Sequence, residues 1–188
     1  MKRSDFEQRV SPRVLVGDGA MGTMLYQQGV FLNRCFDELN LTDSKIVRAV
    51  HDSYVEAGAD FIETNTFGAN RLKLSKFGLV GEVSQINRAG ARIAREAAKD
   101  AVLIAGAIGP LGCELMEHGP ITPKTAGEMF EEQGRALVEG GVDLLILETF
   151  SNPEELLIAI RAVAGLADIP IIAQMTVDED NETIYGER

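Results

Sequence analysis

Residues 56–67 read EAGADFIETNTF, and residues 139–150 read EGGVDLLILETF. Each copy describes the end of a helix, a glycine turn, an aspartate, a short apolar run, and a polar residue followed by Thr-Phe. This order is typical of α/β proteins whose functional side chains follow the carboxyl ends of parallel strands. The repeat therefore predicts that Asn65 and Glu148 occupy equivalent places after two strands of one sheet.

Other parts of the chain extend the same pattern. Five apolar runs predict strands, at residues 14–17, 61–64, 102–108, 144–147 and 169–175. Helical spacing predicts helices at residues 42–57, 83–99 and 122–139, and in the stretch that ends near residue 164. Thr42 is expected to cap the first of these, and residues 151–154 (SNPE) resemble a capping box for the last. Because the strands are apolar without alternation, we expect a parallel sheet that is covered on both faces.

The predicted fold is α/β, of the (β/α)8 TIM-barrel type, with only about the first five β/α units present. No Gly-x-Gly-x-x-Gly or Walker motif follows a strand, which disfavours a nucleotide-binding doubly wound sheet. A full barrel needs about 250 residues, so we expect residues 1–188 to be one partial barrel domain with unpaired first and fifth strands. An open five-stranded sheet is the alternative.

Composition narrows the possible functions. The chain has 188 residues, is 45% hydrophobic and carries a net charge of −11. An acidic chain argues against partners such as nucleic acid or an anionic membrane. No apolar run approaches the roughly 20 residues of a membrane span, and no secretory signal follows the basic start. We therefore expect a cytoplasmic protein.

Polar residues after the predicted strands are the candidate site. Residues 18–23 read DGAMGT, and the backbone N–H groups of such a turn can bind an anion, although the turn also has a purely structural explanation. Glu148 directly follows an apolar run, where a carboxylate is costly unless it is paired. It either receives a substrate ammonium group or makes a structural salt bridge or helix cap.

Alternation along the second predicted strand places Glu63 and Asn65 on one face and Thr64 and Thr66 on the other. Gln174 and Thr176 end the fifth strand and are expected either to add polar contacts to the site or to join a buried network.

The remaining reactive residue types form no recognisable motif. His51 and His118 lack a patterned partner, so surface roles are expected for both. Cys35 and Cys113 have neither metal nor redox spacing and are expected to be buried or incidental thiols. No lysine ends a strand, which weakens a Schiff-base mechanism.

Six stretches, taken together and in order, resemble the homocysteine S-methyltransferase family. They are Gly17–Thr23, Cys35–Asn40, Glu63–Asn70, Ile108–Pro110, Leu147–Phe150 and Ala173–Thr176. The resemblance is strongest to the homocysteine-binding domain of cobalamin-dependent methionine synthase and of the enzyme fused to a methylenetetrahydrofolate reductase.

The resemblance implies a barrel that binds homocysteine and transfers a methyl group to its sulfur in methionine synthesis. Zn²⁺, held by three cysteines in later β/α units, would activate the thiol. Glu148 would receive the substrate's ammonium group. The substrate-binding residues implied are Asp18, Gly19, Ala20, Met21, Asn65, Thr66 and Glu148. Cobalamin and methyltetrahydrofolate would act through other modules, and the resemblance leaves the methyl donor open.

This chain departs from the family pattern because residues 1–188 contain neither cysteine motif. Cys35 and Cys113 do not match the positions of the zinc ligands, so we expect no metal ligands in this chain and interpret it as the N-terminal portion of a longer enzyme. The alternatives are a non-catalytic remnant of the same fold that binds an amino acid or no ligand, and another barrel enzyme with a carboxylate pocket.

Overall fold

Parallel strands form one sheet in the computed structural model, which describes residues 2–98, 102–183 and 186. Within these residues the sheet has four strands in the order β1-β2-β3-β4, all parallel. They are β1 (Phe61–Glu63), β2 (Leu103–Ile108), β3 (Leu144–Phe150) and β4 (Ile171–Met175). The prediction of a parallel α/β architecture is confirmed, and each strand lies beside its neighbour in the chain.

The predicted first strand, residues 14–17, is wrong as a strand. It makes only one isolated parallel bridge, between Gly17 and Phe61. Val14 and Val16 are 84% and 60% exposed, so the segment is not the buried strand that its apolar sequence suggested. The Val16 N–H bonds the carboxylate of Asp60 (3.0 Å), which takes the place of a continuing ladder.

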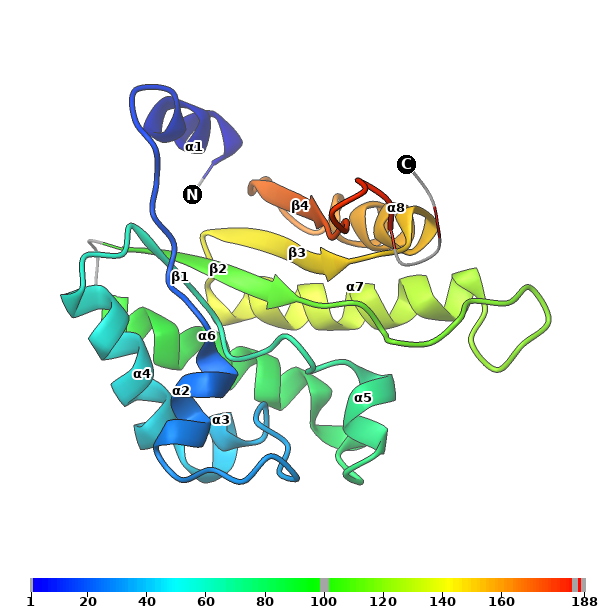
Figure 1. Ribbon diagram of the computed structural model, residues 1–188, viewed down its shortest axis with the longest axis horizontal. Helices are drawn as coiled ribbons and strands as arrows, with labels where there is room; N and C mark the ends of the chain where they lie inside the picture. Colours follow the sequence, from blue (N-terminus) through cyan, green and yellow to red (C-terminus); the bar gives the residue numbers. More distant parts are fainter. Residues whose placement is uncertain (1, 99–101, 184–185, 187–188) are drawn as a thin grey trace.

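Long helices cover one face of the sheet (Figure 1). The elements are α4 (Ser44–Glu56), α6 (Val83–Ala98), α7 (Pro123–Gly140) and α8 (Pro153–Val163). The largest apolar core lies here and joins Ile62, Ile104 and Leu145 of the strands to Phe130 and Leu137 of α7. None of the described helices is long and apolar enough to cross a membrane.

The opposite face of the sheet has a smaller apolar cluster. It consists of Leu103, Ala105, Ala107, Leu144 and Ile146, with Phe6 and Phe61 packed against it. Phe6 belongs to α1 (Arg3–Val10), which stands apart from the other helices in Figure 1. By strand alternation, Glu63 follows Phe61 onto this face and Glu148 follows Ile146.

Helix starts agree only partly with the sequence predictions. Thr122 caps α7 through a capping box with Thr125. The cap of α8 is Asn152, whose side chain accepts from the N–H groups of residues 154 and 155, rather than Ser151. Thr42 caps nothing, because it ends α3 (Leu39–Thr42) and α4 begins at Ser44. The predicted helix end at residue 99 lies outside the described residues.

Three other short elements have no counterpart in the predictions. They are α2 (Met21–Gln27), α5 (Arg71–Ser75) and the 3₁₀ turn η1 (Val80–Glu82). α2 starts four residues after Gly17, which bridges to Phe61 of β1, and α5 starts eight residues after Glu63, the last residue of β1.

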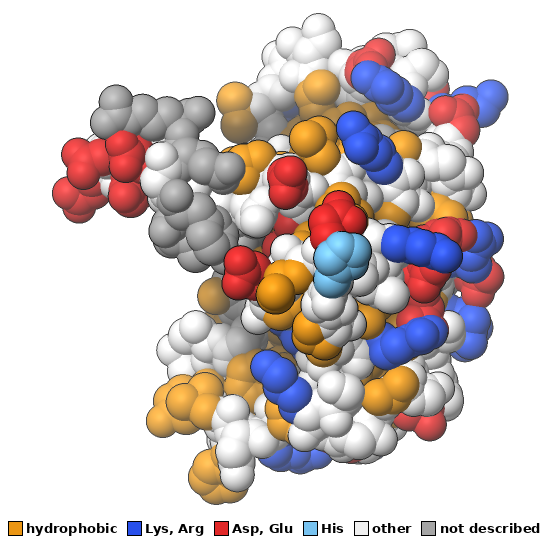
Figure 2. Space-filling view, turned by 90° about the vertical axis from the view of Figure 1, so that its right-hand side faces the viewer, with side chains coloured by type: hydrophobic (Ala, Val, Ile, Leu, Met, Phe, Trp, Pro, Cys, Tyr) orange, Lys and Arg blue, Asp and Glu red, His pale blue; other side chains and the backbone are white. Residues whose placement is uncertain are grey.

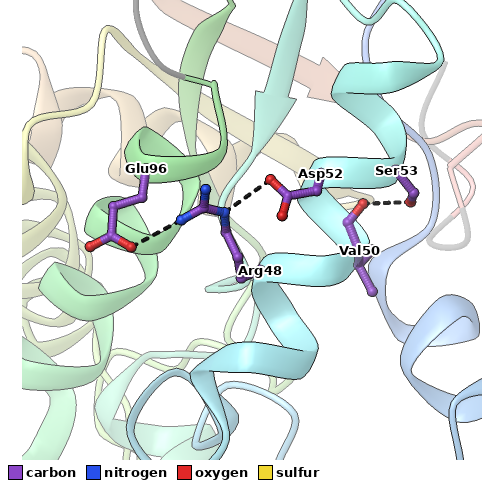
Figure 3. Close-up of polar contacts among 5 residues, drawn as sticks. All are labelled: Arg48, Val50, Asp52, Ser53 and Glu96. Carbon is purple, nitrogen blue, oxygen red and sulfur yellow. Dashed lines mark hydrogen bonds and ion pairs between the residues drawn. The ribbon is translucent and has the colours of Figure 1, made fainter.

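Charged side chains join α4 to α6 at the surface. Arg48 Nε lies 2.9 Å from Asp52 Oδ1, and its Nη1 lies 3.1 Å from Glu96 Oε2 (Figure 3). Exposed pairs of this kind contribute about 0–1 kcal/mol. The packing of the two helices therefore depends mainly on apolar residues such as Val47, Val50 and Ile93.

The aspartates of the repeated phrase make the same contact in both copies. Asp60 accepts from Val16 N and binds Arg13 through both oxygens, at 3.1 and 2.7 Å. Asp143 accepts from Ile104 N (2.9 Å) and from Arg95 (2.7 Å). Each aspartate thus joins its own strand to the preceding segment at the amino end of the sheet. Its backbone N–H reinforces this link, to Val16 O in one copy and Ile104 O in the other.

We expect Asp143→Ala to lower the free energy of unfolding by about 1.5–3 kcal/mol, because Ile104 N–H loses its charged acceptor. The measurement is urea denaturation. Asp168→Ala is the matched control, because Asp168 stands just before β4 but is exposed. Equal stability of the two variants would show that the Asp143 contact does not hold the strands together.

Candidate functional site

A cavity of about 560 Å³ opens at the carboxyl ends of the strands. It is lined by all seven residues singled out from the sequence, namely Asp18, Gly19, Ala20, Met21, Asn65, Thr66 and Glu148. Glu63, Phe36, Asp37, Phe67, Lys73 and Thr149 also line it. The structure therefore brings together residues from three β/α units. Figure 2 views the side toward which β2 and β3 point in Figure 1, where acidic side chains lie among hydrophobic ones.

Asp18 is fixed against β1. Its Oδ2 accepts from Glu63 N (3.0 Å), and its own N–H donates to Phe61 O. Burial raises the pKa of Asp18 to about 7 despite these hydrogen bonds. Gly19 must be small, because a Cβ at this position would lie 2.9 Å from the hydroxyl of Tyr54.

Asn65 and Thr66 shape the wall of the cavity through internal hydrogen bonds. The Asn65 amide donates to Phe36 O (2.8 Å) and Asn40 Oδ1 (3.2 Å). The Thr66 hydroxyl donates to Ala107 O (2.8 Å) and lies 2.6 Å from that of Thr64. Thr64 and Thr66 therefore share a side, as alternation predicted. Because both Asn65 and Thr66 are buried and bonded, they hold the loop in shape.

Glu63 and Glu148 meet in the cavity, where their carboxyl groups hydrogen-bond to each other. Burial, followed by the charges of Glu148 and Asp18, raises the pKa of Glu63 to about 8. Burial also raises the pKa of Glu148. Among the described residues no arginine or lysine forms an ion pair with either group or with Asp18. Asp18, Glu63 and Glu148 thus have no ion-pair partner among the described residues, although Lys73 lines the same cavity and its charge favours the ionised form of Glu148.

A bulge in β3 aims Glu148. The regular register with β4 ends at Leu147 and resumes at Phe150. Thr149, between them, has a φ of 62°, which is rare for a β-branched residue. Its hydroxyl also bonds Glu148 and lowers the pKa of that group. Backbone strain of about 1–3 kcal/mol is thus retained at the point where the side chain turns into the cavity.

Lys73 is a cavity residue that the sequence analysis missed. It lies on α5, which was not predicted, and its Nζ is 4.5 Å from the centre of the Phe67 ring. Burial lowers the pKa of Lys73, although Asp37, Glu155 and Glu148 oppose the shift. The sequence feature that could have predicted α5 is Asn70, which caps this helix by accepting a hydrogen bond from Lys73 N (2.9 Å).

The cysteines do not form a metal site. Cys35 is buried, and burial together with the charge of Asp37 raises the pKa of its thiol to about 11. Burial also raises the pKa of Cys113. Within the described ranges, no group of three or more His, Cys, Asp and Glu side chains is arranged to hold a metal ion. A zinc site of the kind implied by the resemblance does not fit these residues.

The prediction for His51 is wrong, whereas His118 is exposed as expected. His51 is fully buried on α4, and neither ring nitrogen has a hydrogen-bond partner in the described part of the chain. Burial lowers its pKa to about 4, so the ring is neutral. Gln174 and Thr176 are exposed and do not line the cavity, so neither predicted alternative, site contact or buried network, is correct.

Comparison with known proteins identifies the family. A profile of the family described as Homocysteine S-methyltransferase matches residues 15–188. The chain belongs to the homocysteine S-methyltransferase family. It is 29% identical to "Methionine synthase" of Mycobacterium leprae (strain TN) and 30% identical to that of Mycobacterium tuberculosis (strain ATCC 25618 / H37Rv), over 97% of this chain in both cases. It spans only 16% and 17% of the length of these two relatives.

Solved structures share the fold. The metallated form of the homocysteine methyltransferase MmuM from Escherichia coli superposes with a TM-score of 0.84 at 20% identity, over 97% of this chain and 70% of that one. The oxidized form gives 0.80 at 22% identity, over 92% and 65%. The described strands and helices therefore form part of a TIM-barrel-type fold.

We expect Thr149→Gly to be more stable than Thr149→Ala by about 1 kcal/mol, because only glycine adopts positive φ without strain. Both variants lack the hydroxyl, so the difference between their free energies of unfolding measures the backbone strain at this position. At Glu128, exposed within α7, the same pair should reverse, with alanine favoured by about 1 kcal/mol. Equal stabilities of the two Thr149 variants would show that the bulge is unstrained.

Proposed function

We propose that the cavity binds homocysteine, and that this chain supplies the amino-acid-holding part of an enzyme that transfers a methyl group to the homocysteine sulfur. The observation that carries the proposal is the convergence of Asp18, Glu63 and Glu148 in one cavity, where none of the three forms an ion pair with an arginine or lysine of the described residues. Such a cluster favours a cation, and the ammonium group of an amino acid supplies one. Family membership and the methionine synthase relatives support homocysteine as that amino acid.

The two ends of an amino acid would have different partners in the cavity. Glu148, with Asp18 beside it, would receive the ammonium group in charge-assisted hydrogen bonds. The N–H groups of Gly19, Ala20 and Met21 donate no hydrogen bond within the described residues, and they are available to the carboxylate. Asn65 and Thr66 would hold the wall against which the side chain lies.

Activation of the sulfur requires groups beyond those described. A bound Zn²⁺ would supply the thiolate nucleophile at neutral pH, but the described residues do not fit such a site. We propose that the metal ligands lie outside these 188 residues, in further polypeptide of a longer enzyme. Their supply from elsewhere is consistent with the small share of the methionine synthase relatives that this chain spans. Cobalamin and methyltetrahydrofolate would belong to such further modules.

The domain organisation is part of the same proposal. Residues 1–188 would form one section of an eight-unit barrel, and the partly exposed strand β4 would be the edge at which the barrel continues. The alternative is a module that binds homocysteine without transferring a methyl group, which is favoured by the lack of a metal-ligand group among the described residues.

We expect Glu148→Gln to weaken homocysteine binding about ten- to hundredfold, because a charge-assisted contact worth about 1.5–3 kcal/mol is lost. Isothermal titration calorimetry measures the affinity. The desamino analogue 4-sulfanylbutanoate should bind the variant and the unaltered protein equally, since it has no ammonium group. Glu56→Gln, which alters an exposed carboxylate of α4, is the matched control.

Unchanged homocysteine affinity in Glu148→Gln would remove Glu148 from the site. A large fall in melting temperature, with the affinity preserved, would instead assign Glu148 the structural role of a buried polar anchor.

A further inference from the structure

Glu63 and Glu148 come from strands that are not neighbours. They lie at the ends of β1 and β3, and β2 runs between them. Two strand spacings amount to about 9.5 Å, a gap that the two side chains can bridge only over small residues. β2 presents Ala105 and Ala107 on this face, and Ala105 is the register partner of Glu63. Glu148 follows the register pair of Ile108 and Leu147, so it lies further along the sheet than Glu63, and both side chains reach the same cavity past these small residues.

A hydrogen bond between two carboxyl groups requires one proton, because two carboxylates can only accept. We infer that Glu63 is a positioning residue that shares a single proton with Glu148, and that capture of a substrate ammonium group releases this proton to the solvent. The inference rests on the proposed function for the identity of the ligand. It concerns Glu63, which the family resemblance did not assign to the site.

The surroundings place the proton on Glu63. Asp18 interacts with both members of the pair, and Lys73 interacts with Glu148. Around these two lie Tyr54, which interacts with Asp18, and Asp37 and Glu155, which interact with Lys73. Lys73 favours the ionised form of Glu148, and Thr149 donates to the same group. Glu63 has the charges of Glu148 and Asp18 beside it, and these favour its protonated form. The pKa of about 8 at Glu63 agrees with this placement.

The proton has two consequences. While the cavity is empty, protonated Glu63 donates to Glu148 and holds that carboxylate in place without adding a third negative charge. When the ammonium group binds, its charge stabilises both carboxylates, and the proton passes to the buffer. Because the free protein holds a proton that the complex does not, affinity should rise with pH until the pair is ionised, near pH 8.

The first test uses the free protein. Titration of glutamate carboxyl carbons by ¹³C NMR should show one group titrating near pH 8. In Glu63→Gln that signal should disappear, and the signal of Glu148 should move toward ordinary values, because the amide donates the same hydrogen bond without a titrating proton. Glutamate signals that all titrate near their usual pH would overturn the inference, whatever the ligand.

The second test measures homocysteine binding by calorimetry from pH 6 to 8.5, in buffers of different ionisation enthalpy. Glu63→Gln should release about one proton fewer than the unaltered protein at pH 7. At pH 6 the variant should also bind homocysteine more tightly than the unaltered protein does. The difference should be about tenfold for each pH unit below the pH at which the pair ionises in the unaltered protein. At pH 8.5 the two affinities should converge. Glu56→Gln should follow the unaltered protein throughout.

The outcomes separate the two proposals. Binding whose proton release is the same in Glu63→Gln would overturn the role of Glu63 and leave homocysteine as the ligand. Absence of binding at every pH, with the NMR titration as expected, would overturn homocysteine as the ligand while the shared proton stands. If the variant does not fold, the titration of the unaltered protein decides the point.

Discussion

The arrangement of the site depends on two aspartates at the opposite end of the sheet. Asp60 and Asp143 each take a backbone N–H of the preceding segment and an arginine. A parallel sheet has no tight turn to set its register, and these contacts hold the strands against one another at the amino end of the sheet. Glu63 stands three positions after Asp60. Glu148 stands five after Asp143, inside the bulge of β3.

The carboxyl end of the sheet is where stability and function oppose each other. The carboxyl groups of Asp18, Glu63 and Glu148 share one cavity at a cost in free energy through burial and mutual repulsion, and their raised pKa values express that cost. Thr149 adds backbone strain at the same place. The apolar cores on the two faces of the sheet must offset these terms, because the polar contacts among the helices are exposed and weak. A ligand cation would relieve the repulsion that the empty cavity retains.

Most of the strands and the cavity residues could be predicted from the sequence, and the predictions that failed did so for physical reasons. Strands at 102–108 and 144–147 were found because both are continuous apolar runs that follow a turn and an aspartate or a helix end. The run at 14–17 looked the same, yet its Val16 N–H bonds the Asp60 carboxylate instead of a strand, and Val14 is exposed. Lys73 was missed because α5 has five residues, too few for helical periodicity to show. Glu63 was seen on the correct face, but a partner two strands away cannot be inferred from spacing along one strand.

The two copies of the repeated phrase show how one unit is adapted to two tasks. Both keep the glycine turn, with Gly58 and Gly141 at φ of 95° and 93°, and both keep the aspartate contact. The amino ends of the two copies are therefore structurally equivalent. Their carboxyl ends differ. In the first copy Asn65 and Thr66 bond inward and close the wall, whereas in the second the bulge turns Glu148 outward into the cavity. Glu148 can be held at the end of β3 because Asn65 and Thr66, after β1, form an ordered wall of the same cavity.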